Sequence, residues 1–294
     1  MLHEAARNGG DVAKCEALLI AGHDPNKRDD EGRTPLHLAA EGARSTSVDL
    51  GVCGVLLAAG ANPNIRDNSG FSPLEVAAQS CRADIVDVLL VNGGNPNDVD
   101  EYGFTALHSA VTVRKGNVEV IERLVQGGAN LEAMTNEHET PFLVAITMVW
   151  IVPKNCYALL NKGADVNARD AKKRTALLIT ACNPSLMPMI DELLRWGADE
   201  RLVDNEGHNV RYHINQWPDG ILKQSAVTYV EGSVYRRRRK NWRARGWLVM
   251  LKKAKEDGKD YLASSGDGDE ALAHLVEAIF LMNDGVWRSL LGFL

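Results

Sequence analysis

Apolar residues recur in short blocks along the first two thirds of the chain, and the blocks keep one interval constant. Each copy has a core leucine that is followed four residues later by glycine and 16 residues later by a Thr-like position. The leucines are Leu18, Leu56, Leu89, Leu124, Leu159 and Leu193, and the glycines are Gly22, Gly60, Gly93, Gly128, Gly163 and Gly197. A glycine at this place suits the left-handed residue that ends a helix. The small polar residue two positions later favours a turn.

A second block begins at each Thr-like position and has its own signature. The segment Thr34-Pro35-Leu36-His37-Leu38-Ala39-Ala40 is related to the segments at 72–78, 105–110, 140–145 and 175–181, and an abbreviated copy opens the chain at Leu2–Ala6. A natural cap and a truncated repeat are both consistent with that first copy.

The spacing and the T-P-L-H-type motif resemble the ankyrin repeat, a turn plus two antiparallel helices of about 33 residues. The resemblance covers residues 1 to about 215 and implies an all-α solenoid of helix-turn-helix repeats with hairpin turns. One helix pair cannot bury its apolar face alone, so neighbouring repeats must stack. We expect about six repeats and a degenerate seventh capping unit within residues 1–231, in which Arg211 replaces the usual leucine, and a small, basic helical module at 232–294.

The extra residues of the longest copy lie between its two helices, chiefly at Glu41–Asp49, where we expect a surface loop. A second unusual stretch, Met148–Ile151, is an apolar loop that either packs under the repeat or forms a contact patch.

The cysteines and histidines have structural explanations in the repeat. Cys15, Cys53 and Cys156 lie three residues before the core leucine and are predicted to be buried apolar fillers, whereas Cys81 and Cys182 fall at turns between helices. The repeat uses the histidine at positions 3, 37 and 108 for hydrogen bonds within its framework. No Cys/His spacing matches a zinc site, and the odd number of five cysteines indicates no disulfide framework.

In proteins of this kind, partners are usually held by the hairpin tips and the first-helix face on the concave side. Carried onto this sequence, the variable tip positions predict partner-binding residues at Asp30, Glu31, Arg33, Asn68, Phe71, Glu101, Tyr102, Phe104, Glu137, Glu139, Lys172 and Arg174, with Ser69 and Asn136 at the same tips. At two tips His138 and Lys173 replace the usual glycine, so reshaped turns are expected there.

Three aromatic residues on neighbouring tips, Phe71, Tyr102 and Phe104, are not required by the fold. Aromatic side chains are common interface anchors. The alternative is that they pack against adjacent tips and make the hairpins rigid. Carboxylates flank them at Asp29, Asp30, Glu31, Asp100 and Glu101, which favours a basic or neutral partner.

Charge is distributed unevenly along the chain. Residues 236–255 contain ten basic and no acidic residues, which leaves 23 basic and 39 acidic residues elsewhere, a net charge of −16. The basic residues include Arg236, Arg237, Arg238, Arg239, Lys240, Arg243 and Arg245. Apolar residues at helical spacing predict an amphipathic helix with a solvated basic face, and a second helix is expected at 269–283. The functional alternatives are nuclear import, binding of nucleic acid or anionic lipid, and self-association or intramolecular docking against the acidic repeats.

Composition adds little beyond this. No segment approaches the roughly 18 apolar residues of a membrane span, and the N-terminus lacks the features of a secretory signal. The expected protein is an intracellular, cytoplasmic monomer, nuclear if the basic segment is an import signal. The loose match Gly266–Ala271 to a dinucleotide-binding turn lacks its βαβ context. No catalytic residues, cofactor or metal are therefore predicted, and the expected role is a scaffold that binds another protein.

Overall fold

The computed structural model describes residues 1–7, 11–42, 46–148 and 152–233. The repeats lie in one compact unit, Met1–Val227. The predictions for residues 149–151, the basic segment 236–255, the motif at 266–271 and the helix at 269–283 lie outside the described residues.

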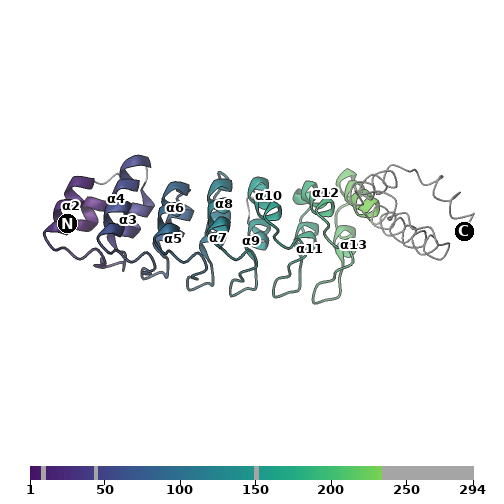
Figure 1. Ribbon diagram of the computed structural model, residues 1–294. Coiled ribbons are helices and arrows are strands. Elements are labelled where there is room, and N and C mark those ends of the chain that lie inside the picture. The colour runs from purple at the N-terminus through teal and green to yellow at the C-terminus, as the bar shows by residue number, and fades with distance from the viewer. Residues whose placement is uncertain (8–10, 43–45, 149–151, 234–294) are drawn as a thin grey trace, which may run out of the picture. The chain divides into compact units, whose positions relative to one another are not determined.

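Two rows of helices make up the repeat unit (Figure 1). The first helices of the repeats are α1 (Leu2–Ala6), α3 (Pro35–Glu41), α5 (Pro73–Gln79), α7 (Ala106–Val111), α9 (Pro141–Thr147), α11 (Ala176–Ala181) and α13 (Val210–Asn215). The second helices are α2 (Val12–Ile20), α4 (Thr46–Ala58), α6 (Ala83–Val91), α8 (Val118–Gln126), α10 (Pro153–Asn161) and α12 (Met187–Arg195), the last preceded by the short 3₁₀ helix η1 (Pro184–Leu186). Each first helix contacts the first helix of the next repeat, so the array is all-α and continuous, as predicted.

The core follows the sequence pattern closely. Five of the six core leucines, from Leu56 to Leu193, are fully buried, and so are Cys15, Cys53 and Cys156. Cys81 and Cys182 are exposed. The predicted cysteine environments are therefore confirmed. All six glycines after the second helices have a φ between 86° and 99°, which is the left-handed conformation expected of them.

A hairpin joins each repeat to the next, and one polar side chain organises each tip. At the tip of residues 100–104, Asp100 Oδ1 accepts hydrogen bonds from the backbone N–H groups of Tyr102 and Phe104, both at 2.8 Å. Asp29, Asp67, Asp170 and Asp204 hold their tips in the same way. These carboxylates satisfy backbone N–H groups of the turn and so give the tips their common shape.

The expectation that the two tips without glycine are reshaped was wrong. His138 and Lys173 adopt φ values of 59° and 58°, the conformation that Gly103 adopts in the equivalent place. The closing hydrogen bonds are also retained, with 2.9 Å from His138 N to Thr135 O and 2.8 Å from Lys173 N to Asp170 O. The hydrogen-bonded tip holds a non-glycine residue in a conformation that costs about 1–2 kcal/mol.

Histidine links successive repeats, as its repeat position predicts. In the buried His37 ring, Nδ1 accepts the Thr34 N–H at 3.0 Å and Nε2 donates to Phe71 O of the next tip at 3.0 Å. His108 makes the corresponding bond to Glu139 O at 3.1 Å, and His3 donates to Arg33 O at 3.0 Å. Both nitrogens of His37 and His108 are therefore occupied by the fold.

The insertion at Glu41–Asp49 is not a loop throughout, which corrects the prediction. Part of it extends α4, which has 13 residues where α6 and α8 have nine. Asp49 in this extension is 0% exposed and forms an ion pair with Arg82 of the next repeat at 2.9 Å. Arg82 also donates to Gly42 O at 2.9 Å. A charge that could not remain buried alone is thus neutralised by a long-range partner.

Candidate protein-binding surface

The aromatic tips border a concave hollow of about 540 Å³ on the hairpin side of the array. Its lining comes from three successive tips and from the first helices behind them. These residues are Phe71, Gln79, Asp100, Tyr102, Phe104, Ser109, Thr112, Thr135, Asn136, Glu137 and Glu139. The structure therefore brings together six of the tip positions that the sequence singled out, namely Phe71, Tyr102, Phe104, Asn136, Glu137 and Glu139.

The three aromatic side chains have different surroundings. Phe71 and Phe104 are half-buried, and the Phe104 ring lies 5.3 Å from the His108 ring, centroid to centroid. That contact is the kind that makes a hairpin rigid. Tyr102, in contrast, is 67% exposed. An aromatic ring left largely in water at the edge of a hollow is a good anchor for a partner, because its burial on binding releases a large apolar area.

The hollow is acidic. Among its lining residues three are carboxylic acids, Asp100, Glu137 and Glu139, and none is lysine or arginine. Burial raises the pKa of Glu139, and the nearby Asp170 carboxylate raises it further. A cation bound close to Glu139 would favour its charged form, so a positively charged ligand side chain is electrostatically suited to this place.

Two of the flanking carboxylates proved to be structural groups. Asp29 forms an ion pair with Arg33 at 3.2 Å and accepts the N–H groups of its own tip. Asp100 is 8% exposed and its Oδ1 is used inside the tip. Asp29 and Asp100 therefore act within their own tips, whereas Asp30, Glu31 and Glu101 are exposed.

The other predicted partner-binding residues do not line the hollow. Asn68 connects two tips, because its side chain donates to Asp30 O at 3.0 Å and accepts from Arg28 at 3.2 Å. Arg174 forms an ion pair with Asp170 at 2.7 Å, and Lys172 is exposed. Neither Lys172 nor Arg174 lines the hollow.

Four lining residues were not identified from the sequence: Gln79, Ser109, Thr112 and Thr135. Gln79 donates to Ser109 Oγ at 3.4 Å across the two neighbouring first helices, α5 and α7. Gln79 is the last residue of α5 and Thr112 directly follows α7, whereas Ser109 lies inside α7. Gln79 and Thr112 each lie seven residues after the Thr-like position of their repeat, and this shared position was the available signal for those two.

The thiols lack the character of nucleophiles. Burial raises the pKa of all five cysteines, and it raises the pKa of Cys53 and Cys156 to about 12. Thiols in these surroundings stay protonated at neutral pH. Among the residues that the structure describes, no helix is both long and apolar enough to cross a membrane.

Comparison with protein families agrees with the architecture. The family model for ankyrin repeats (3 copies) matches residues 2–100 and 84–170. The chain belongs to the ankyrin-repeat family, whose repeats are generally protein–protein interaction modules and typically non-enzymatic scaffolds. No curated protein matches the chain.

Proposed function

We propose that this protein is a non-enzymatic scaffold that holds a segment of a partner protein in the hollow between Phe71, Tyr102 and Phe104. The exposure of Tyr102 carries the proposal, because the fold gives this ring no packing role of the kind Phe104 has. The partner segment is apolar enough to cover the ring and carries a lysine or arginine beside Glu137 and Glu139.

The acidic lining also defines what the hollow selects. A cationic side chain can approach the aromatic faces and the carboxylates together. It is then attracted both by the negative faces of the rings and by the charge of the carboxylates. An acidic segment would meet like charges at every approach and bind more weakly. We therefore expect the charge of the partner segment to matter as much as its apolar content.

Selection of displayed random peptides on the full chain tests the proposal without knowledge of the partner. Peptides that bind should be enriched in lysine or arginine next to an apolar or aromatic residue. Tyr102→Ala should weaken their binding on the order of 30-fold, the size of an interface hot spot. A joint Glu137→Gln and Glu139→Gln change should remove the preference for basic peptides without lowering the thermal midpoint.

Val91→Ala is the matched control. Val91 is 86% exposed and does not line the hollow, so this change also removes exposed apolar surface, at another place. Its affinity for the selected peptides should equal that of the unaltered chain. An equal loss of peptide affinity in Tyr102→Ala and Val91→Ala would refute the proposed mode of binding. So would selected peptides that show no preference for basic residues.

A second role is supported by the segment 236–255, whose ten basic residues stand against a net charge of −16 in the rest of the chain. It would serve as an adaptor for nucleic acid or anionic membranes, or as an import signal. Binding of DNA or of phosphatidylserine vesicles should then fall steeply with salt and disappear when Arg236–Arg239 are replaced by glutamate. Binding that is insensitive to salt would exclude this role.

A further inference from the structure

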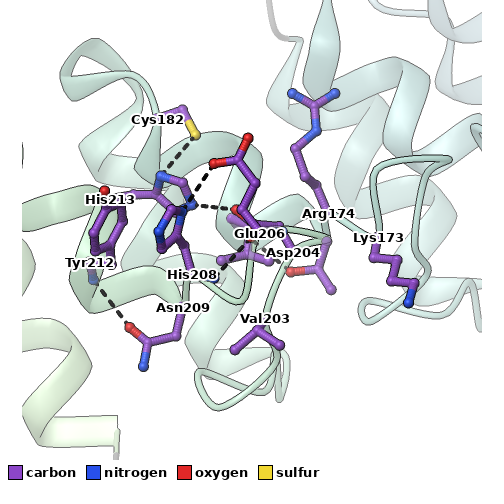
Figure 2. A network of polar contacts seen from close by, with 12 residues as sticks. Lys173, Arg174, Cys182, Val203, Asp204, Glu206, His208, Asn209, Tyr212 and His213 are labelled. Atoms are coloured by element: carbon purple, nitrogen blue, oxygen red, sulfur yellow. Dashed lines mark hydrogen bonds and ion pairs between the residues drawn. The ribbon is translucent and has the colours of Figure 1, made fainter.

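The last hairpin of the repeats carries a cluster of residues that can bind metal. Asp204 and His208 lie opposite each other at the base of this tip, where Asp204 N donates to His208 O at 3.0 Å. His213 lies one residue past the first turn of α13 and faces the same place. One ligand atom from each of the three residues can be chosen so that all lie within 4.8 Å of one another (Figure 2).

The carboxylate of Asp204 is oriented by the tip itself. Its Oδ1 accepts the N–H groups of Glu206 at 3.0 Å and His208 at 2.9 Å. The second oxygen, Oδ2, is left to face His213 Nε2, 2.9 Å away. Because Asp204 is 7% exposed, this arrangement is held within the protein and not at a free surface.

His208 is fixed but incompletely bonded. Its ring stacks on Tyr212 with a centroid separation of 3.5 Å and an interplanar angle of 2°. Its Nδ1 atom is buried and has no hydrogen-bond partner, although Glu206 Oε2 lies 3.3 Å away. In His37 and His108 both nitrogens are used by the fold, so an enclosed and unpartnered imidazole nitrogen sets His208 apart from them.

We propose that Asp204, His208 and His213 form a binding site for a zinc ion, toward which the exposed side chain of Glu206 can turn as a fourth ligand. Zinc is bound tetrahedrally at about 2.0–2.2 Å by imidazole nitrogen and carboxylate oxygen, which places neighbouring ligand atoms about 3.3 Å apart. The observed separations of 2.9 Å between Asp204 and His213 and 3.3 Å between Glu206 and His208 are close to this spacing. Two carboxylates and two neutral imidazoles would balance the charge of the ion.

Cys182 supports the site without being a ligand. Its Sγ lies 3.6 Å from His213 Nδ1, on the other side of the ring from Asp204 (Figure 2). The neutral His213 ring carries its proton on Nε2, where the proton is shared with Asp204. When zinc binds to Nε2, that proton must move to Nδ1. There the sulfur can accept it in a hydrogen bond, as an outer partner of a metal-bound histidine does. The ion would join the last hairpin to α13 and so brace the end of the repeat array.

Titration of the chelator-treated full chain with Zn²⁺, followed by calorimetry, tests the site, and Co²⁺ serves as a visible-absorption probe. We expect one equivalent to bind and the thermal midpoint to rise with zinc concentration. His208→Phe keeps a ring to stack on Tyr212 but removes the nitrogens, and Asp204→Asn keeps the oxygen that the tip needs. Each should lower zinc affinity by more than the roughly 10–100-fold that loss of an outer partner costs, and Cys182→Ala, which removes the acceptor sulfur, should fall within that range.

His138→Asn is the control, since it removes an exposed histidine from another tip and asparagine tolerates the left-handed conformation. It should bind zinc like the unaltered chain. The site is supported if His208→Phe and Asp204→Asn lose the bound equivalent of zinc and His138→Asn retains it. No saturable uptake, or uptake unchanged in His208→Phe, would overturn it.

Discussion

Glu75 occupies the position at which three other repeats have histidine, and we expect it to make the third repeat sensitive to pH. The residue is 1% exposed. Its Oε2 accepts the Ser72 N–H at 2.9 Å, but its Oε1 is buried without a hydrogen-bond partner. Burial raises its pKa from 4.5 to about 8, against the lowering effect of the Ser72 bond. The folded protein therefore keeps this carboxyl protonated at neutral pH.

The sign of the effect follows from proton uptake. Between pH 4.5 and pH 8 the unfolded chain has lost this proton and the folded chain has retained it, so folding takes up a proton and stability falls as pH rises. Below pH 4.5 both states are protonated and the penalty is absent. At pH 7 the difference in pKa corresponds to a penalty of up to about 3 kcal/mol.

Glu75→Gln removes the ionisation and keeps an oxygen that can accept the Ser72 N–H. Urea unfolding at pH 5 and at pH 7.5 should show nearly equal stabilities of variant and unaltered chain at the lower pH. At the higher pH the variant should be more stable by about 1–3 kcal/mol. Glu101→Gln, at an exposed tip position, should show no such difference. An equal effect of Glu75→Gln at both pH values would refute the argument.

Three further predictions follow from the fold. Arg82→Ala should lower the free energy of unfolding in urea by about 3–5 kcal/mol, because it removes the ion pair with the buried Asp49 carboxylate; a loss below 1 kcal/mol would contradict this. Lys173→Gly should raise the thermal midpoint through roughly 1 kcal/mol of relieved strain, whereas Lys172→Gly beside it should not. Burial lowers the pKa of His108 to about 4, so the stability it contributes is present above pH 6.5 and is lost as pH falls toward 4. His108→Leu should therefore flatten the acid limb of a stability profile, and an unchanged limb would contradict that assignment.

The fold could be predicted from the sequence because an ankyrin repeat fixes local geometry at a few positions. The six glycines, the buried cysteines and the histidine links all follow from residue type and interval alone. The insertion could not be predicted in this way. Asp49 in the helical extension is paired with Arg82, 33 residues later, and no local pattern carries that information.

The candidate sites were predictable to different degrees. Repeat phase placed Phe71, Tyr102 and Phe104 at successive tips, but their common hollow depends on how the neighbouring repeats stack. The cluster around His208 escaped the search for zinc spacings, since its ligands are brought together by a hairpin and not by a short motif. The sequence did contain a signal for this cluster. Residues 204 and 208 hold the same repeat positions as residues 100 and 104, and the two residues at these positions face each other across their hairpin tip.

Glu75 also connects stability with the proposed binding surface. His37 donates to the carbonyl of Phe71, and by position Glu75 stands where a histidine would donate to the carbonyl of Phe104. The tip that presents Tyr102 therefore belongs to a repeat junction where an unfavourable buried acid replaces a favourable histidine bond. Natural proteins often retain such unfavourable residues beside functional surfaces, where greater stability reduces activity. The affinity of the Glu75→Gln variant for the selected peptides distinguishes the two possible roles of this residue. If the affinity is unchanged and the stability is raised, Glu75 is only an unfavourable buried group. If the affinity is reduced, Glu75 supports the binding surface.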